Sequence, residues 1–442
     1  MHSLIGRRLL QSEIPFDDDQ IARFIKKGML INERALVDRG SITCLRCGNQ
    51  DPHLFASHFC AKCQKMCTYC RHCLLLGKIS ECQMLYRWNG PELSFPQHEH
   101  PLQWEGKLSS AQKRASDAVA KTVQEQKQLL LWAVCGAGKT EVLFEGIARA
   151  LSAGKRVLVA TPRTDVVKEL FPRFKKSFPR VTITALYGGN RHRRFDAQFV
   201  VATTHQVMRY YKAFDWIVVD EVDAFPFSFD KSLRYAINEA KKETSSLIYL
   251  SATPSKEWLR SPDIEQMKIP KRYHGYPLPI PKFKWCGNWL KSVKKGHLPK
   301  PIRNWLTAKL KQQKQVLLFV PSIHILRTLS EVLQSNSFQH DTVHAADNRR
   351  HALITDFREQ KSSLLVTTTI LERGVTFPDV QVGVVGAEQD IFTEAALVQI
   401  AGRVGRHRDW PDGDVIFFHY GVSLEMRRAY THINLMNREG GF

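Results

Sequence analysis

The residues best suited to chemistry in this chain are its cysteines, because eight of the ten fall between positions 44 and 82. Two Cys-x2-Cys pairs separated by twelve residues are typical of a zinc ribbon, in which two knuckles meet across a hairpin. Four more cysteines follow, and their pairing stays open because Cys70 can form a knuckle with either neighbour. The sequence predicts a first zinc site at Cys44, Cys47, Cys60 and Cys63, and allows a second at Cys67, Cys70, Cys73 and Cys82. Such a module can be structural support alone, or it can contact DNA or protein.

A second group of reactive residues lies in the segment AVCGAGKTE, Ala133–Glu141, where an apolar run gives way to a helix-like one. Its glycines permit tight turns that direct successive backbone N–H groups toward phosphate oxygens. The lysine can reach the β- and γ-phosphates, and the threonine hydroxyl can bind Mg²⁺. We therefore predict a phosphate-binding loop for ATP and Mg²⁺ at Gly136, Ala137, Gly138, Lys139 and Thr140.

Carboxylates follow another apolar run in VVDEVD, Val218–Asp223. Asp220 can hold the Mg²⁺ together with Thr140, and Glu221 can orient or deprotonate the attacking water. The next apolar run ends in SAT, Ser251–Thr253. A solvated loop is the plainer interpretation of adjacent carboxylates, but their position downstream of a phosphate loop favours the metal-binding role.

Arginines with a defined spacing lie near the end of the chain, in QIAGRVGR. Each can offer a planar donor fork to a phosphate and stabilise charge on a transferring γ-phosphoryl group. A solvated helix face is the alternative, but the two glycines of the motif are poor helix formers. The predicted site residues are Gln399, Arg403 and Arg406 in this motif, and Arg373 and Gly374 in the preceding segment TTTILERGVTFP.

These motifs need elements that position them, and the pattern of apolar runs indicates which. Runs such as LLLWAV, RVLVATP and WIVVDE alternate with amphipathic segments, and the alternation returns in QVLLFVPS, LLVTTT and VQVGVVG. Such alternation predicts an α/β fold with parallel sheets covered by helices. The predicted divisions are a helical segment at 1–40, the zinc-binding cysteine module at 41–90, an ATP-binding domain at 91–270, a basic hinge at 271–300 and a second α/β domain at 301–442.

The charge of the chain indicates an acidic partner, since the formal net charge is +21 and the pI is about 9.6. A nucleic-acid backbone fits, and a generic solubilising charge or an anionic membrane surface are the alternatives. The basic runs Arg191–Arg194 and Lys294–His297 are candidate phosphate-tracking surfaces. The absence of a secretory signal and of a membrane-spanning apolar window predicts a cytoplasmic protein, in which cysteines persist as thiols or metal thiolates.

Three phenylalanines, Phe225, Phe227 and Phe229, alternate immediately after the predicted catalytic carboxylates. In an extended loop this alternation would place all three rings on one side, where nucleic-acid bases could stack. Ordinary core packing is an equally good interpretation.

The ordered motifs AVCGAGKT, TPRTDVV, ATTHQ, DEVD, SAT, TTTILERG and QIAGRVGR resemble those of superfamily 2 helicases and translocases. The resemblance covers about residues 105–420 and implies two tandem RecA-like P-loop domains. It also implies that Gln112, in WEGKLSSAQ upstream of the phosphate loop, reads the adenine of ATP. With a cysteine module in front and DEVDAFPF at the second motif, the whole chain is similar to the late competence protein family ComFA.

Membership in that family implies a DNA-dependent ATPase that pulls incoming single-stranded DNA through the uptake channel during natural transformation. The implied partners are single-stranded DNA, the membrane channel and other competence proteins, with a homo-oligomer as a further option. The implied location is the cytoplasm, peripheral to the inner face of the cell membrane. Three alternatives are a PriA-like replication-restart or repair helicase, a nucleotide-switched nucleic-acid scaffold and an RNA-directed motor.

Overall fold

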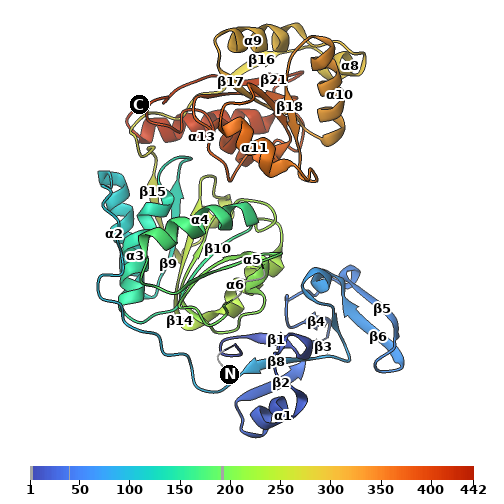
Figure 1. Ribbon diagram of the computed structural model, residues 1–442, viewed down its shortest axis with the longest axis vertical. Coiled ribbons are helices and arrows are strands. Elements are labelled where there is room, and N and C mark those ends of the chain that lie inside the picture. Colours follow the sequence, from blue (N-terminus) through green and yellow to red (C-terminus); the bar gives the residue numbers. More distant parts are fainter. Residues whose placement is uncertain (1–2, 39, 191–193) are drawn as a thin grey trace. The chain divides into compact units, whose positions relative to one another are not determined.

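The chain folds into two compact units in the computed structural model (Figure 1). One unit comprises Met1–Leu131 and Thr140–Met267, and the other comprises Trp132–Lys139 and Lys268–Phe442. Arg191–Arg193, which make up most of one predicted basic run, lie outside the described residues. The structure describes residues 3–38, 40–190 and 194–442.

The first ninety residues form small antiparallel sheets, whereas the sequence predicted a helical segment over residues 1–40. Among the described residues of that segment, only Asp18–Lys26 is α-helical, and Asp17 and Gln20 cap its start reciprocally. The strands on either side of this helix form because they pair with β8, a strand that follows Cys82, and local sequence does not reveal that partner. The sheets have the orders β1-β8-β2, β3-β4 and β5-β6-β7. The elements are β1 (Arg8–Leu10), η1 (Gln11–Glu13), α1 (Asp18–Lys26), β2 (Leu30–Arg34), β3 (Leu36–Asp38), β4 (Ile42–Cys44), η2 (Pro52–Leu54), β5 (Phe55–Cys60), β6 (Lys65–Cys70), η3 (Arg71–Leu76), β7 (Ile79–Ser80) and β8 (Met84–Trp88).

The first α/β lobe is built on a sheet that has seven strands in the described chain, in the order β11-β12-β10-β13-β14-β9-β15. The pairs β10–β12, β10–β13, β11–β12 and β13–β14 are parallel, as the alternation of apolar and amphipathic segments predicted. The elements are α2 (Ser110–Glu125), β9 (Gln128–Ala133), α3 (Lys139–Ser152), β10 (Val157–Thr161), α4 (Thr164–Ser177), β11 (Ile183–Leu186), β12 (Phe199–Thr203), α5 (Thr204–Val207), β13 (Phe214–Val219), α6 (Lys231–Ala240), β14 (Lys241–Ser251), α7 (Lys256–Arg260) and β15 (Ile264–Ile269).

Helices cover both faces of this sheet. Figure 1 shows α3 and α4 together on one face, where Phe144 and Phe174 meet edge to face with ring centroids 6.3 Å apart. One continuous core on the other side joins α5 and α6 to the strands and also contains Cys44, Cys47, Cys70 and Cys73. The cysteine module therefore packs on the first lobe, and the predicted divisions at residues 40 and 90 do not separate compact units.

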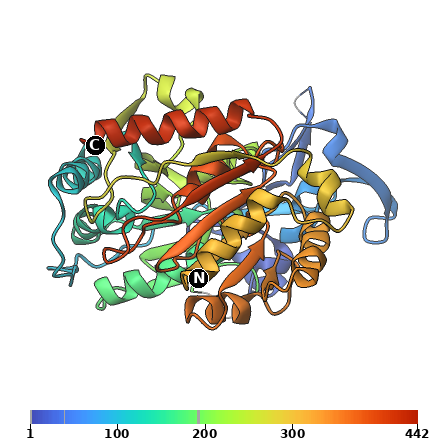
Figure 2. The ribbon, with the colours of Figure 1, turned by 90° about the horizontal axis from the view of Figure 1, so that it is seen from above.

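The second lobe has a six-stranded sheet among its described residues, in the order β16-β21-β20-β17-β19-β18, with every registered pair parallel. Helices α8, α9 and α10 pack together on one face, and α13 lies on the other (Figure 2). The predicted hinge at 271–300 contains β16, an edge strand of this sheet, so part of it belongs to the lobe. The elements are β16 (Lys282–Trp285), α8 (Trp289–Lys294), α9 (Lys300–Lys311), β17 (Gln315–Phe319), α10 (Ile323–Ser335), β18 (Asp341–Val343), α11 (Arg350–Arg358), β19 (Leu364–Thr367), η4 (Thr369–Leu371), β20 (Val380–Val385), α12 (Glu394–Ala401), β21 (Val415–His419) and α13 (Leu424–Glu439).

The predicted α/β fold class with two sheet-based lobes is confirmed. Within the described chain, every helix is too short or too polar to cross a bilayer.

Candidate nucleotide and metal sites

The predicted phosphate loop occupies the turn between β9 and α3. Gly136 and Gly138 have φ angles of 80° and 73°, a left-handed conformation that side chains with a Cβ rarely adopt. The Ala137 N–H donates to the Val134 carbonyl at 3.1 Å, which closes the turn. Thr140 is buried in the first turn of α3, whose N-terminal N–H groups have no partner within the helix. This is the strand–loop–helix context in which such N–H groups bind phosphate oxygens.

The predicted metal and water ligands follow β13 directly. The Asp220 N–H donates to the Ala160 carbonyl at 2.8 Å, which extends the pairing of β13 with β10 by one residue. Asp220 Oδ1 accepts the Glu221 N–H at 2.8 Å, and Glu221 adopts a φ of 55°. Both residues are partly exposed at the end of a buried strand. Oxygen ligands of this kind suit Mg²⁺, which keeps several of its waters.

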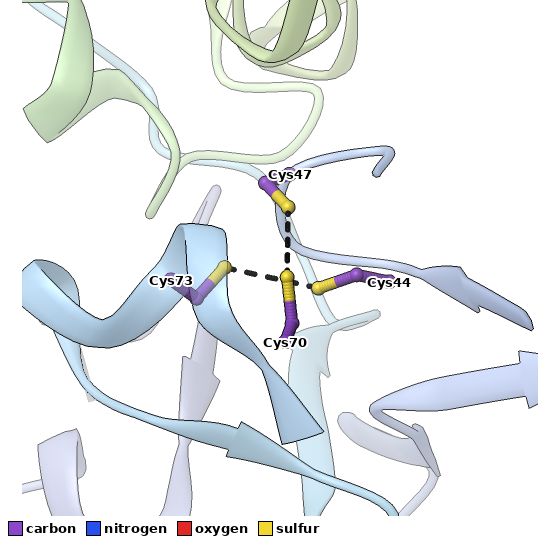
Figure 3. A group of neighbouring side chains, drawn as sticks. All are labelled: Cys44, Cys47, Cys70 and Cys73. Carbon is purple, nitrogen blue, oxygen red and sulfur yellow. Dashed lines mark hydrogen bonds between the residues drawn. The ribbon is translucent and has the colours of Figure 1, made fainter. Parts of the chain in front are cut away.

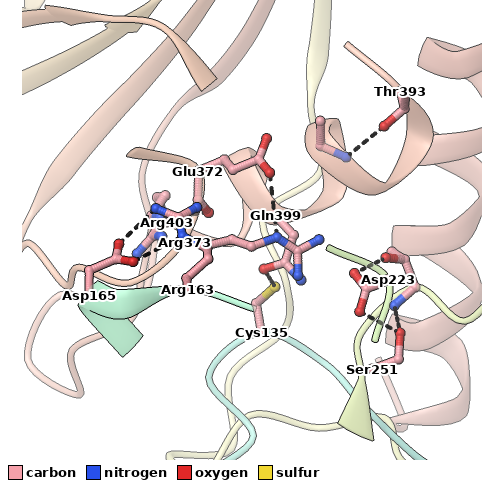
Figure 4. A network of polar contacts seen from close by, with 12 residues as sticks. Cys135, Arg163, Asp165, Asp223, Ser251, Glu372, Arg373, Thr393, Gln399 and Arg403 are labelled. Atoms are coloured by element: carbon pink, nitrogen blue, oxygen red, sulfur yellow. Dashed lines mark hydrogen bonds and ion pairs between the residues drawn. The ribbon is translucent and has the colours of Figure 1, made fainter. Parts of the chain in front are cut away.

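Asp223 has a role that the sequence did not assign. Its two carboxylate oxygens accept the hydroxyls of Ser251 and Thr253, each at 2.7 Å, and the Thr253 N–H donates to Ser251 Oγ at 3.0 Å (Figure 4). The last carboxylate of VVDEVD is thereby tied to the SAT segment at the end of the neighbouring strand β14. The signal that could have identified it is a pair of hydroxyl residues at the end of one strand and an unassigned carboxylate at the end of the next.

The two predicted arginines differ in their surroundings. Arg403 is completely buried, and its guanidinium donates to the carbonyls of Glu372 and Val375. It therefore holds the turn that contains Arg373 and Gly374. Arg406 is partly exposed, and its Nε donates to the Gly402 carbonyl at 2.8 Å.

Arg272, which sequence reasoning missed, supports the loop that carries Arg406. It is buried, and its guanidinium donates to the carbonyls of Gly405 at 2.5 Å and Val404 at 2.8 Å. Burial and the positive charge of Arg406 lower the pKa of Arg272 to about 10. Only its position within the predicted hinge at 271–300 could have drawn attention to it, and basic residues are common there.

The other predicted nucleotide-site residues have defined places. Gln112 is buried at the start of α2, and its Oε1 accepts the Ser109 N–H at 2.8 Å in a capping box. Arg373 is buried, and its Nε lies 3.5 Å from Glu372 Oε1. Gln399 is buried on α12 and accepts a hydrogen bond from the Cys135 thiol at 3.1 Å, within the second compact unit (Figure 4). Their contacts with a nucleotide remain predictions.

The cysteines form two groups, but not the two that the sequence predicted. Within each group, every pair of sulfurs lies within 4.8 Å. Figure 3 shows the first group, in which the Cys44 and Cys73 sulfurs are 3.8 Å apart and the Cys47 and Cys70 sulfurs are 3.7 Å apart. Four sulfurs about 2.3 Å from one tetrahedral zinc ion would be about 3.8 Å apart, so this group fits zinc. The described chain groups Cys44, Cys47, Cys70 and Cys73 together, and Cys60, Cys63, Cys67 and Cys82 together.

Strand geometry explains this correction. Cys67 and Cys70 lie three residues apart on β6, so their side chains leave opposite faces of the hairpin and cannot share one metal ion. Cys60 lies on the same face as Cys67, because β5 pairs His58 with Cys67 and Cys60 with Lys65. The register of this hairpin decides the grouping, and spacing along the chain does not reveal it.

The first cysteine group is joined to the segment of the first lobe that follows Asp220. His72, between Cys70 and Cys73, lies 2.6 Å from Ser232 Oγ and 3.2 Å from an Asp230 oxygen. Tyr235 on α6 donates its hydroxyl to the Leu45 carbonyl at 3.2 Å. Polar contacts of His72 and Leu45, which lie next to cysteines of the group, therefore join it to α6 and to the residue before that helix.

The three phenylalanines do not lie on one side of an extended loop, because the segment turns instead. Phe227 is buried in the core of the first unit, whereas Phe225 and Phe229 are 75% and 77% exposed. The two exposed rings lie 6.4 Å apart between centroids. Phe227 therefore packs in the core, which was one of the two alternatives left open by the sequence, and base stacking by Phe225 and Phe229 stays a prediction.

Three family models match successive parts of this chain. A family model described as the competence protein ComFA N-terminal domain matches residues 1–87. Models described as type III restriction enzyme, res subunit, and helicase conserved C-terminal domain match residues 105–256 and 299–408. The competence protein ComFA of Bacillus subtilis (strain 168) is 44% identical over 439 residues, which cover 98% of this chain and 94% of that protein. The chain belongs to the ComFA family of competence proteins. The same-named protein of Streptococcus pneumoniae (strain ATCC BAA-255 / R6) is 34% identical and covers 99% of this chain and 98% of its own length.

Other relatives share parts of the motor. The replication restart protein PriA of Bacillus subtilis is 26% identical over 166 residues, which are 34% of this chain and 21% of that protein. The solved structure of S. cerevisiae Dbp5 bound to RNA and ADP BeF3 aligns with a TM-score of 0.56 and 17% identity, over 76% of this chain and 88% of that one. This likeness confirms the predicted tandem RecA-like fold. The ComFA-family chain is therefore a competence-related, superfamily 2 helicase-like ATPase that binds nucleic acid.

Proposed function

We propose that this chain is an ATP-dependent translocase on single-stranded DNA that drives DNA uptake into the cytosol during natural transformation. The observation that carries the proposal is the extent of its similarity to competence proteins, 98% and 99% of the chain in two relatives. Replication-restart relatives match only part of the motor. The channel of the cell membrane and other competence proteins are the partners that this function requires, at the inner face of the membrane.

The proposed ATP site assigns a task to each motif. Lys139 and the N–H groups of the phosphate loop bind the phosphates, while Glu221 orients the attacking water. Thr140 and Asp220 would hold Mg²⁺, which would neutralise part of the phosphate charge when bound. Arg406 is the arginine that we expect at the γ-phosphate, because Arg403 is committed to the carbonyls of the 372–375 turn.

Nucleotide and DNA are expected to be coupled through the RecA-like lobes. ATP binding favours closure of the lobes, hydrolysis relaxes it, and one lobe then advances along the strand. Gln112 is the residue proposed to read adenine, and Gln399, Arg373 and Gly374 are proposed to complete the site. We also propose that Cys44, Cys47, Cys70 and Cys73 hold Zn²⁺, which replaces the core that so small a module cannot supply.

A steady-state ATPase assay tests the proposal. Turnover is expected to rise with single-stranded DNA and to fall to background in Lys139→Ala and Asp220→Ala. Lys113→Ala, on the exposed face of α2, is the matched surface control and is expected to behave as the native chain. Undiminished turnover in both motif variants would refute the mechanism.

Two further measurements separate the proposal from its rivals. Robust separation of a forked duplex would favour a PriA-like unwinding enzyme over a translocase that takes up single strands. Tight ATP binding with negligible turnover would instead indicate a nucleotide-switched scaffold. If RNA and single-stranded DNA stimulated ATP turnover equally, the chain would not be specific for DNA.

A further inference from the structure

The second group of cysteines lies away from the ATP motifs, on the β5–β6 hairpin and the turn after β7. Cys60 ends β5, Cys63 lies in the hairpin turn, Cys67 lies within β6, and Cys82 lies between β7 and β8. The group thus joins the tip of the hairpin to the turn that leads into the central strand of the β1-β8-β2 sheet.

The spacing of the sulfurs matches a tetrahedral metal site. All four lie within 4.8 Å of one another, and the Cys60 and Cys82 sulfurs are 3.8 Å apart. A zinc ion with four thiolates about 2.3 Å away places the sulfurs about 3.8 Å apart, whereas a disulfide requires about 2.05 Å. All four thiols are free in the structure. Four convergent sulfurs at this separation are the donor set that Zn²⁺ prefers.

The backbone of the hairpin turn is arranged as a metal knuckle. The N–H groups of Lys62 and Cys63 hydrogen-bond the Cys60 sulfur, and the Lys65 N–H hydrogen-bonds the Cys63 sulfur. The chain reverses at Gln64, which has a φ of 55° and donates its N–H to the Cys60 carbonyl at 2.8 Å. N–H groups directed at sulfur stabilise thiolates and orient them for a metal, as second-shell hydrogen bonds do in general.

The two cysteine groups are chemically alike but differ in burial. All four cysteines of the first group are buried, whereas Cys63 and Cys82 of the second are partly exposed. Solvent and chelators can therefore reach two ligands of the second group directly. A metal ion held there is expected to exchange faster than one held by the buried group.

We propose that Cys60, Cys63, Cys67 and Cys82 form a second Zn²⁺ site, separate from the first and faster in metal exchange. Binding converts up to four thiols to thiolates and releases their protons. The bound metal fixes the hairpin, which carries Phe59 and Met66 as exposed cross-strand partners, 63% and 65% exposed. Neither the nucleotide site nor the DNA motor needs this site, so it stands independently of the proposed function.

Metal stoichiometry and release kinetics of the full chain test the proposal. Protein purified under reducing conditions without chelator is expected to contain two zinc ions per chain. The double variant Cys63→Ser/Cys82→Ser is expected to contain one, as is Cys44→Ser/Cys47→Ser, while the control Cys286→Ser in the second lobe keeps two. The chelator 4-(2-pyridylazo)resorcinol is expected to release native zinc in two phases, and the fast phase is expected to be absent from Cys63→Ser/Cys82→Ser.

Two outcomes would overturn the second site. One is a native stoichiometry of one zinc that is unchanged in Cys63→Ser/Cys82→Ser. The other is a single resonance in the four-sulfur region of the ¹¹³Cd NMR spectrum of native protein reconstituted with cadmium, where two are expected. The NMR measurement uses no substitution, so misfolding of a variant cannot account for its result. Thiol titration of the unfolded, metal-free chain without reductant distinguishes disulfides, which would leave fewer than the ten thiols in the sequence.

Discussion

Glu13 is the carboxylate that joins the amino-terminal segment to the cysteine module and to the first lobe. It pairs with Arg46, whose side chain is completely buried beside Cys47, and with Arg209 Nε at 2.9 Å. Its Oε2 also accepts the Leu10 N–H at 3.0 Å. Because Arg46 is removed from water, its charge depends on this single carboxylate.

Replacing Glu13 with alanine is therefore expected to destabilise the first unit substantially. Removing one partner of a buried ion pair typically costs about 3–5 kcal/mol, because the other charge stays buried. Urea unfolding followed by tryptophan fluorescence measures the change. Glu243→Ala, which removes an exposed partner of Lys212, is the matched control and is expected to change stability little. Equal midpoints for the two variants would contradict this account of Arg46.

The lowered pKa of Glu13 leads us to expect that the free energy of unfolding decreases at acid pH. Burial by itself raises the pKa of Glu13, but Arg46, the Leu10 N–H and Arg209 together lower it below its ordinary value. The stabilisation is therefore complete above the ordinary carboxyl range and is lost as the pH falls through the lowered pKa of the folded state. The difference in unfolding free energy between the native chain and Glu13→Gln is expected to shrink toward acid pH. If this difference in unfolding free energy did not change with pH, the Glu13 carboxyl would have the same pKa in the folded and unfolded states.

Arg272 leads to a prediction about catalysis. Its guanidinium fixes the Gly402–Gly405 backbone that carries Arg406, so it is a positioning residue. Arg272→Lys keeps the charge but loses the planar fork, and we expect kcat to fall about ten- to a hundredfold because the loop shifts. Affinity for a fluorescent ATP analogue is expected to change little. Arg303→Lys, at an exposed position of α9, is the control, and an equal loss of kcat and ATP affinity would contradict a positioning role.

The individual residues that could be predicted are those whose role depends on neighbours in the sequence. The glycines of the phosphate loop lie between an adjacent strand and helix, so the sequence alone located that turn. Asp223 and Arg272 act on residues that are distant along the chain, and their partners are recognisable only after folding. Arg403 was identified as a site residue, but its backbone partners at 372–375 depend on how two loops of the second lobe meet.

The segment Asp223–Asp230, which follows the carboxylates predicted to be catalytic, combines exposed and buried rings. Phe225→Ala with Phe229→Ala is expected to weaken binding of single-stranded DNA, since each lost base stack costs about 1–3 kcal/mol. The melting temperature is expected to stay unchanged because both rings are exposed. Fluorescence anisotropy with a labelled oligonucleotide measures the affinity.

Phe227→Ala is the matched contrast, because its ring is buried and its loss is expected to cost about 3–5 kcal/mol of stability. Unchanged DNA affinity in the Phe225/Phe229 double variant would remove this segment from the proposed DNA path.

Among the elements, the parallel sheets were predictable because buried strands read as continuous apolar runs between amphipathic helices. The antiparallel sheets of the first ninety residues were not, since their strands are short and β8 pairs with segments fifty or more residues away. The predicted grouping of the cysteines was wrong for a related reason. One hairpin register decides which face each sulfur occupies, and spacing carries no information about register.

For the whole molecule, the cysteine module and the first lobe are one structure with a shared core. Cys44, Cys47, Cys70 and Cys73 belong to the same cluster of buried residues as Val219 of β13 and Leu233 of α6. His72 and Tyr235 add polar contacts across the same junction. A change in the first cysteine group is thus expected to reach β13, the strand that Asp220 directly follows.

Substitutions in the first cysteine group distinguish structural support of the first lobe from a role in gripping DNA. Cys44→Ser/Cys47→Ser is expected to lower the unfolding temperature of the first unit and also to weaken ATP-analogue binding, because structural zinc contributes to folding and this core continues into β13. Circular dichroism melts and analogue titrations measure the two effects, with Cys286→Ser as the control. If unfolding temperature and ATP affinity were both retained while stimulation by single-stranded DNA disappeared, the group would act as part of the DNA grip. If all three fell together, the metal would be holding the motor's first lobe in its working form.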